Sequence, residues 1–184
     1  HDLAYKFFPN EFLSGDLYKL NKWTEYSVKK AARVICVSEH TKSDLVKFFP
    51  KVESKTSVVL NGFRTPKKLR VTGYKLQESN PYILFVGTIQ PRKNISALIE
   101  AFEEFVQAHP EFELKIVGKR GWLYSETLKR IESSPFLKQI KYLGFVADKE
   151  LESLYVNAYA TVLSSHYEGF GLPVLEAMSY GSPV

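Results

Sequence analysis

Short apolar runs alternate with amphipathic stretches along the chain. The runs predict six strands, at 34–37, 56–60, 82–86, 113–117, 140–143 and 160–163. The segments between them fit helices, most clearly 94–108, where apolar residues recur at the three-and-four spacing of a buried face and glutamates take the other face. Because a helix is the usual crossover between parallel strands, this order predicts an α/β fold with helices on both faces of the sheet.

Two further helix starts follow from capping chemistry. Asp148 is a predicted N-cap, with acidic residues in the turn after it and an apolar stripe facing inward. Pro173 fits the first position of a helix, because its ring fixes φ and its missing N–H would be unpaired there. A helix is therefore predicted to start near Leu172.

The segment from Arg64 to Pro81 breaks the alternation, since it is rich in Pro, Gly, Ser and Asn and has no sustained periodicity. We interpret 65–81 as a linker between one α/β piece, 1–64, and a second α/β unit, 82–184. The sequence closes on Val184 after a Gly-Ser-Pro turn, where another strand would begin. Both α/β units are therefore expected to be incomplete.

Composition adds a few constraints. The chain has 184 residues, 45% of them hydrophobic, and no apolar run approaches the roughly 20 residues of a membrane span. The single cysteine, Cys36, lies in an apolar run and is expected to be buried, which favours a reducing compartment. The net charge of +5 fits an anionic ligand, a nucleic acid or an acidic membrane. Lys and Arg are scattered among acids, however, so no nucleic-acid partner is expected.

The segment Tyr167–Ala177 combines two glutamates with a glycine-rich turn before the last predicted helix. Gly169 and Gly171 let the backbone approach a ligand, and the positive end of the helix dipole favours an anion such as phosphate. The expected anion-binding amides are those of Phe170, Gly171 and Leu172. Glu176 could accept from ribose hydroxyls and Glu168 from a sugar. The alternative is that Glu168 is a solvated loop charge and Glu176 complements the helix dipole.

A second cluster follows the predicted strand 82–86. Gly87 ends the strand with room for a ligand, and Arg92 and Lys93 place two cations at the carboxyl edge of the sheet, where open α/β folds bind ligands. Arg and Lys both bind phosphate oxygens. The alternative is a solvated basic pair beside a helix start. No Gly-x-Gly-x-x-Gly opens a helix, which argues against an oxidoreductase.

Several motifs then occur in a characteristic order. They are Ala32-Arg-Val-Ile-Cys-Val-Ser-Glu39 with Thr41 and Leu45, Asn61-Gly62, Gly87 with Arg92-Lys93-Asn94, Lys115-Ile-Val-Gly118, Gly144-Phe-Val146, and Glu168-Gly-Phe-Gly-Leu-Pro-Val-Leu-Glu176. On these motifs the chain resembles the retaining glycosyltransferases of the group 1 type, family 4. That resemblance implies a GT-B fold of two Rossmann-like domains, with 1–64 from the acceptor side and 82–184 binding the nucleotide-sugar donor.

The resemblance also implies roles for single residues. Arg92 and Lys93 would hold the diphosphate, Glu176 the ribose and Glu168 the donor sugar near the reacting carbon. Backbone at Gly144 and Phe145 would lie beside the base. His1, in a His-Asp pair that ends an acceptor-domain strand in the family, would act with Glu168 as a catalytic residue. No Asp-x-Asp occurs, and no metal or other cofactor is expected.

The function implied is transfer of a sugar from a nucleotide-diphosphate sugar to a glycan or lipid-linked acceptor. The opening His1-Asp2-Leu3 with Phe8-Pro9 is similar to bacterial mannosyl- and rhamnosyltransferases of polysaccharide biosynthesis, so GDP-mannose is the first expectation for the donor. The alternative is a non-catalytic nucleotide-sugar or partner-binding module. We expect cytoplasmic localisation, with peripheral contact at the inner membrane as an option. Transfer needs both substrates held together, and the acceptor-side unit is expected to be incomplete. These 184 residues alone are therefore expected to transfer little sugar.

Aromatic residues in the first portion leave two interpretations open. Tyr18, Trp23 and Tyr26 lie at helical spacing, which is typical of buried or interdomain packing. The alternative is an acceptor-facing or membrane-facing surface.

Overall fold

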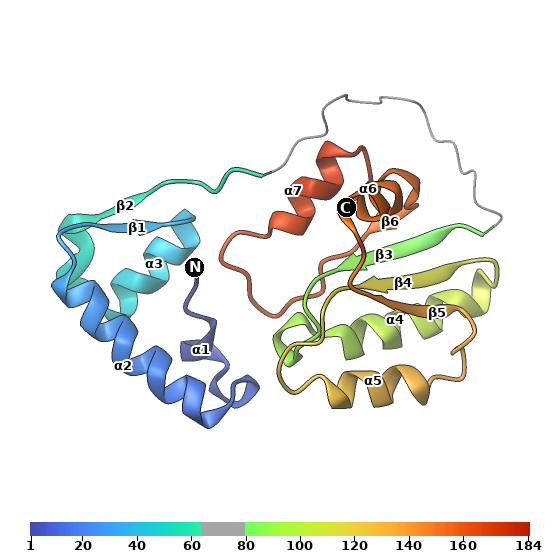
Figure 1. The fold of residues 1–184 in the computed structure, drawn as a ribbon, viewed down its shortest axis with the longest axis horizontal. Coiled ribbons are helices and arrows are strands. Elements are labelled where there is room, and N and C mark those ends of the chain that lie inside the picture. Colours follow the sequence, from blue (N-terminus) through green and yellow to red (C-terminus); the bar gives the residue numbers. More distant parts are fainter. Residues whose placement is uncertain (64–79) are drawn as a thin grey trace. The chain divides into compact units, whose positions relative to one another are not determined.

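The computed structural model describes residues 1–63 and 80–184. The chain forms two compact units, His1–Gly62 with Tyr167–Phe170, and Phe63–His166 with Gly171–Val184 (Figure 1). Most of the predicted linker, 65–79, lies outside the described residues. The short segment 167–170 belongs to the first unit although its neighbours in sequence belong to the second, a division that the sequence does not indicate.

The second unit is built on a four-stranded parallel sheet in the order β5-β4-β3-β6. Its strands are β3 (Tyr82–Val86), β4 (Glu113–Val117), β5 (Ile140–Gly144) and β6 (Ala160–Thr161). The chain runs outward from β3 through β4 to β5, and then returns to the other side of β3 to form β6. The strand order therefore reverses between β3 and β6, and such a switch point is where open α/β sheets bind ligands.

Side-chain alternation along the strands explains the helices on both faces of this sheet. On β3, Tyr82 and Leu84 point to the face covered by α6 (Asp148–Asn157) and α7 (Leu172–Ser179). Phe85, one position on, points to the opposite face, covered by α4 (Ile95–Ala108) and α5 (Ser125–Glu132), as Figure 1 shows. A strand buried on both faces must be apolar throughout, which is why the strand appears in the sequence as a continuous hydrophobic run.

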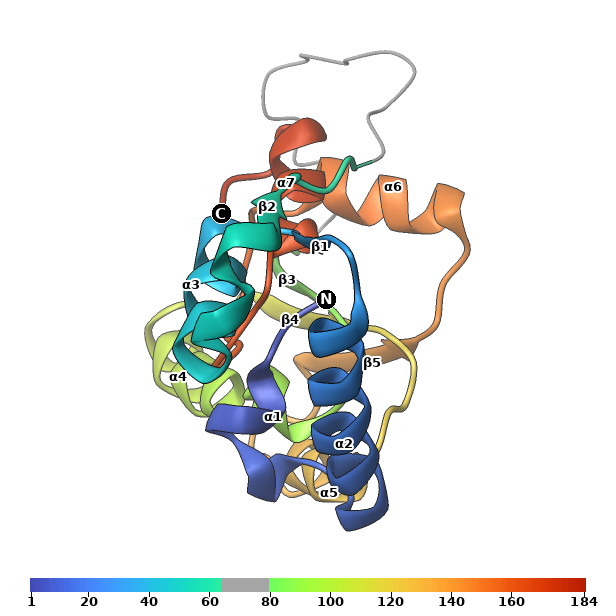
Figure 2. The same ribbon diagram turned by 90° about the vertical axis from the view of Figure 1, so that its left-hand side faces the viewer.

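The first unit contains a smaller parallel pair, β1 (Val34–Cys36) and β2 (Thr56–Val58). Three helices accompany it, α1 (Ala4–Phe7), α2 (Ser14–Lys30) and α3 (Glu39–Phe48), together with the 3₁₀ turns η1 (Pro9–Glu11) and η2 (Pro50–Lys55) (Figure 2). Cys36 is buried in their shared core, as expected, and burial raises the pKa of its thiol. Its core partners are Leu3, Tyr5, Val28, Leu45 and Val52.

The predicted elements are confirmed with small differences at their ends. All six strands form, although β1 ends one residue and β2 and β6 each end two residues earlier than predicted, and β5 extends to Gly144. The expectation that Asp148 is an N-cap is wrong, because Ala147 holds the cap position and Asp148 is the first helical residue. Pro173 is the second residue of α7 rather than the first, and the helix starts at Leu172 as predicted.

The interpretation of Tyr18, Trp23 and Tyr26 as buried packing is wrong for this structure. These side chains lie on α2 and are 65%, 58% and 56% exposed. Helical spacing placed them opposite the apolar stripe of α2, whose Leu17, Leu20 and Val28 pack into the core. Within the described residues, no helix is both long enough and apolar enough to cross a bilayer.

Candidate functional site

The two predicted motifs follow the two strands that flank the switch point of the second unit. Gly87 to Asn94 follow β3, and Val162 to His166 follow β6. Hydrogen bonds join these segments. Among them, the His166 amide donates to the Arg92 carbonyl (3.0 Å), and the Ser164 hydroxyl donates to the Lys93 carbonyl (2.8 Å). The fold therefore brings the basic pair next to the chain that leads into the glutamate segment.

Lys93 passes over Gly87. A Cβ atom placed on Gly87 would lie 3.7 Å from Lys93 Cε and 3.3 Å from the Phe85 ring, so a glycine leaves room for the lysine stem. Lys93 is 8% exposed. Arg92 and Lys93 lie in the 3₁₀ turn η3 (Pro91–Lys93), and Asn94, with a φ of 50°, turns the chain from η3 into α4. The two cations thus sit just before the helix, at the carboxyl edge of the sheet.

Gln90 is a candidate that the sequence did not single out. Its side chain is 4% exposed, and among the described residues its Oε1 atom has no hydrogen-bond partner. A buried acceptor without a donor is costly, and such groups are uncommon away from ligand sites and ordered waters. Because Gln90 lies three residues from Lys93 in the same turn, we add it to the candidate donor-binding residues.

The turn predicted to bind an anion leads into the N-terminus of α7. Gly171 takes the cap position with a φ of 83°, a left-handed conformation that glycine adopts without strain. Pro173 has no N–H, and the Val174 amide donates back to the Gly171 carbonyl (3.0 Å). An anion at this helix would therefore be bound by the Leu172 amide rather than by residues 173 and 174.

Glu176 is oriented by a buried tyrosine. The hydroxyl of Tyr155, on α6, donates to Glu176 Oε2 over 3.0 Å, and the Tyr155 ring stacks on Tyr180 with centroids 5.5 Å apart. Burial raises the pKa of Tyr155, and the Glu176 carboxylate raises it further, so the phenol stays a proton donor. A carboxylate fixed in this way keeps further lone pairs for ligand hydroxyls.

The ends of β4 and β5 contribute to the same edge. Gly144, with a φ of 70°, ends β5, and its carbonyl accepts from the Gly118 amide (2.8 Å). The Phe145 ring is 68% exposed, and Lys119 Nζ lies 4.5 Å from its centroid. Lys119 was not predicted as a site residue, because nothing in its local sequence distinguishes it from other surface lysines. The parallel topology places it beside the predicted base-binding backbone.

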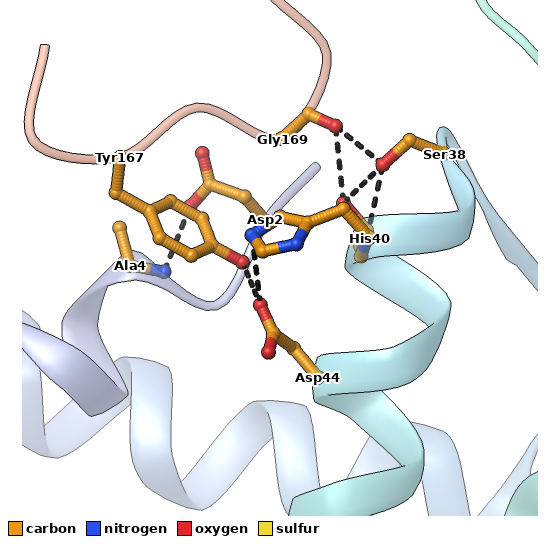
Figure 3. Close-up of polar contacts among 8 residues, drawn as sticks. Asp2, Ala4, Ser38, His40, Asp44, Tyr167 and Gly169 are labelled. Carbon is orange, nitrogen blue, oxygen red and sulfur yellow. Dashed lines mark hydrogen bonds and ion pairs between the residues drawn. The ribbon is translucent and has the colours of Figure 1, made fainter.

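Glu168 and His1 belong to the first unit. A Cβ atom on Gly169 would lie 2.7 Å from the His1 carbonyl oxygen and 2.8 Å from Asp2 Cβ, so the loop and the first residues of the chain are in close backbone contact. Figure 3 shows this contact region, in which Tyr167 and Gly169 also meet residues of α3. The two predicted catalytic residues thus come from adjacent backbone segments.

Metal-ligating side chains do not cluster in the part of the chain that the structure describes. In 1–63 and 80–184, no group of three or more His, Cys, Asp or Glu side chains is arranged to hold a metal ion.

Comparison with known proteins gives one family. The family model described as "Glycosyl transferases group 1" matches residues 71–184. Among curated proteins, O-antigen chain mannosyltransferase B of Escherichia coli is 30% identical over 192 residues, which cover 100% of this chain and 50% of that protein. O-antigen chain mannosyltransferase RfbU of Salmonella typhimurium is 30% identical over 185 residues, covering 100% of this chain and 49% of the relative. The chain spans about half the length of these relatives.

Solved structures share the fold. Anabaena HepE in complex with UDP and glucose has a TM-score of 0.72 at 22% identity, covering 96% of this chain and 49% of HepE. WaaG, a glycosyltransferase involved in lipopolysaccharide biosynthesis, has a TM-score of 0.72 at 18% identity, covering 100% of this chain and 54% of WaaG. The expected α/β architecture with the Rossmann-like parallel units of GT-B enzymes is confirmed by these likenesses and by the observed sheets.

Proposed function

Because the chain belongs to the group 1 glycosyltransferases, we propose that it takes part in moving a sugar from a nucleotide-diphosphate sugar to a glycan or lipid-linked acceptor, with retention of the anomeric configuration. The observation that carries the proposal is the switch point between β3 and β6. The basic pair Arg92 and Lys93 follows one flanking strand, and the chain leading to the glutamate segment follows the other. Phosphate-binding cations and the hydroxyl-binding segment therefore follow the two strands between which such sheets bind ligands.

Different residues bind different parts of the donor. Lys93 and Arg92 hold the diphosphate and neutralise the charge that develops on it as it leaves, which is the main demand of this reaction. The amide of Leu172 and those of the loop before it bind phosphate or sugar oxygens, and Glu176 binds the ribose. Gln90 adds a buried acceptor, and the backbone at Gly144 and Phe145 lies along the base. No metal is assigned to the diphosphate, since two side-chain cations supply the compensating charge.

Glu168 binds the donor sugar near its reacting carbon. His1, which belongs to the same unit as Glu168, contacts the acceptor or the donor. GDP-mannose is the proposed donor, and its sugar is supported by the two mannosyltransferase relatives. A non-catalytic nucleotide-sugar-binding module would use the same contacts without turnover. Turnover of the full-length protein separates the two.

Donor binding is tested by thermal unfolding of the full-length protein with UDP-, GDP- and dTDP-sugars. A donor at about 100 times its dissociation constant stabilises the folded state by about 2.7 kcal/mol, which corresponds to a rise of several degrees in Tm. We expect the largest rise with GDP-mannose and its loss in Lys93→Ala. Lys141→Ala, an exposed lysine of β5, is the matched control and should keep the rise. If no nucleotide sugar raises Tm, the donor-binding proposal is wrong.

We also propose that α2 contacts an anionic membrane surface. Tyr18, Trp23 and Tyr26 are exposed on α2, and Lys22 Nζ lies 5.6 Å from the Tyr18 ring centroid and 6.0 Å from that of Trp23. Aromatic rings among lysines are typical of helices that lie in the interface of anionic bilayers. A lipid-linked acceptor would give such a contact a purpose.

Vesicle binding tests this contact. Each lysine near an anionic surface contributes about 1 kcal/mol, so the double variant Lys22→Gln, Lys30→Gln should bind phosphatidylglycerol vesicles roughly thirtyfold more weakly at low salt. Lys138→Gln with Lys141→Gln removes the same charge from the second unit and is the control. Equal losses in the two variants, or no binding by the unaltered full-length protein, would refute the contact.

A further inference from the structure

The motif Ala32–Glu39 with Thr41 marks the first unit in the sequence, but the proposed function gives it no role. In the structure this motif leads into α3, whose N-cap is Ser38. The loop 167–170, which carries Glu168, packs in the same unit and meets α3 at two points (Figure 3). These two contacts lie on either side of Glu168.

The first contact holds Tyr167. Its hydroxyl donates to Oδ2 of Asp44, a carboxylate that is buried on α3, and His40 Nε2 lies 3.4 Å from the same oxygen. The Tyr167 ring is stacked on Phe7 with centroids 5.4 Å apart. Burial raises the pKa of the Tyr167 phenol and the Asp44 carboxylate raises it further, so the hydroxyl keeps its proton for this bond. The ring packing and the charge-assisted hydrogen bond together hold the Tyr167 side chain in one orientation.

The second contact holds Gly169. Its carbonyl accepts hydrogen bonds from the hydroxyls of Ser38 (2.6 Å) and Thr41 (3.2 Å). Ser38 caps α3 by accepting from the Thr41 amide (3.0 Å), and of the two acceptors near its hydroxyl, the Gly169 carbonyl is nearer (2.6 Å) than Thr41 Oγ1 (3.1 Å). On the other side Gly169 lies against the His1 carbonyl, which leaves no space for a side chain. The loop is therefore fixed from two directions at this residue.

Because the Gly169 carbonyl is held by these hydrogen bonds, the orientation of the Phe170 amide is held as well. The peptide group is planar and trans, so the carbonyl of Gly169 and the N–H of Phe170 point in opposite directions in one plane. Two hydroxyls on the carbonyl therefore direct the Phe170 amide away from α3. Glu168 stands between two held residues, and its backbone has little freedom left.

We propose that Asp44, Ser38 and Thr41 are positioning residues that hold Glu168 and the Phe170 amide in the orientation that binds the donor sugar. The inference rests on the proposed function, in which these two groups contact the donor. It goes beyond that function by giving the motif Ala32–Glu39 with Thr41 a role in recognition of the donor sugar, and not in binding of the nucleotide. Nucleoside diphosphate contacts come from other residues, chiefly Lys93, Arg92 and Glu176.

This division gives a readout that a purely structural role would not move. Loosening the loop should lower the affinity for the nucleotide sugar and the turnover number, while the affinity for the nucleoside diphosphate alone stays unchanged. The informative quantity is the ratio of the two dissociation constants, nucleotide sugar over nucleoside diphosphate. General destabilisation would weaken both ligands together and leave the ratio constant.

The experiment uses the full-length protein with GDP-mannose and GDP, or the nucleotide pair that raises Tm most. We expect Thr41→Val and Tyr167→Phe each to lower kcat/KM by about tenfold to a hundredfold, the effect of a displacement of about 1 Å in a binding group. GDP affinity should change less than about twofold, well below the tenfold that corresponds to about 1.4 kcal/mol. Thr41→Ser keeps the hydroxyl and should restore activity, and Tyr159→Phe is the matched control on an exposed tyrosine.

Each outcome decides something. If the unaltered protein turns over no nucleotide sugar, the proposed function fails and this inference with it. If the unaltered protein is active and both variants keep its kcat/KM, only the positioning role is refuted. A parallel loss of GDP affinity, or failure of Thr41→Ser to restore activity, also refutes it. Should Thr41→Val fail to fold, Tyr167→Phe gives the same test through the other contact.

Discussion

Replacing Glu168 by glutamine should lower sugar transfer by the full-length protein by about 10²–10³-fold, the size expected when one charge-stabilising group is removed. Cleavage of a glycosidic bond leaves positive charge on the reacting carbon of the sugar. A carboxylate beside that carbon stabilises the charge, whereas a neutral amide of the same shape does not. The nucleoside diphosphate should still bind, because the contacts proposed for it are those of Arg92, Lys93 and Glu176.

The measurement is single-turnover transfer or donor hydrolysis, with binding of the nucleoside diphosphate followed separately. Glu152→Gln is a suitable control, because that glutamate is exposed on α6. Retained binding with lost turnover identifies an enzyme in which Glu168 acts on the sugar. If Glu168→Gln transfers sugar at the original rate, Glu168 is a loop charge and the assignment of the catalytic residue is wrong.

Replacing Gly118 by alanine should lower the free energy of unfolding of the second unit by about 3 kcal/mol or more, because overpacking and a strained backbone act together. A Cβ atom there would lie 1.9 Å from the Gly87 carbonyl oxygen, and Gly118 has a φ of 153°. The two nearest atoms are the carbonyl oxygen and carbon of Gly87, and as backbone atoms they cannot rotate away as a side chain could. The change also disturbs Gly87, over which Lys93 passes, and donor affinity should fall with stability.

Gly144→Ala separates the two causes. Gly144 also has a positive φ, 70°, but a Cβ atom placed on it would have no other atom within 4 Å. Its alanine variant therefore measures backbone strain alone, about 1–2 kcal/mol. Chemical denaturation of the full-length protein gives both values. If Gly118→Ala lowers the free energy of unfolding no more than Gly144→Ala does, the close approach of Gly118 to Gly87, just after β4 and β3, is incorrect.

The sequence predicted β3, an inner strand of the sheet in the second unit, well because this strand is buried on both faces. Such strands must be apolar at every position, so a five-residue run such as Tyr82–Val86 stands out against the amphipathic helices. The ends were less certain. Apolar residues continue past Thr161 and Val58, and strand pairing, which decides where each strand stops, is not visible in the run itself.

Predictions made from one helix alone were weaker. The spacing of Tyr18, Trp23 and Tyr26 was compatible with a buried face, but the buried face of α2 is formed by three smaller apolar residues and the aromatic residues lie outside it. Likewise, Asp148 has the chemistry of an N-cap, and yet the helix begins on it. Local propensity is a weak guide when neighbouring elements decide which face is covered and where a helix starts.

The sequence by itself determined the strands, the main helices and the positions of the two turns that we propose to bind the donor, because each depends on residues close together in the chain. Only the tertiary structure decided which of those turns are neighbours and what holds them. Tyr167 meets Asp44 across 123 positions, and Gly169 meets Ser38 across 131. Tyr155 finds Glu176 only after α6 and α7 pack on one face of the sheet. Contacts at such separations arise from the packing of whole elements, which a local pattern does not encode.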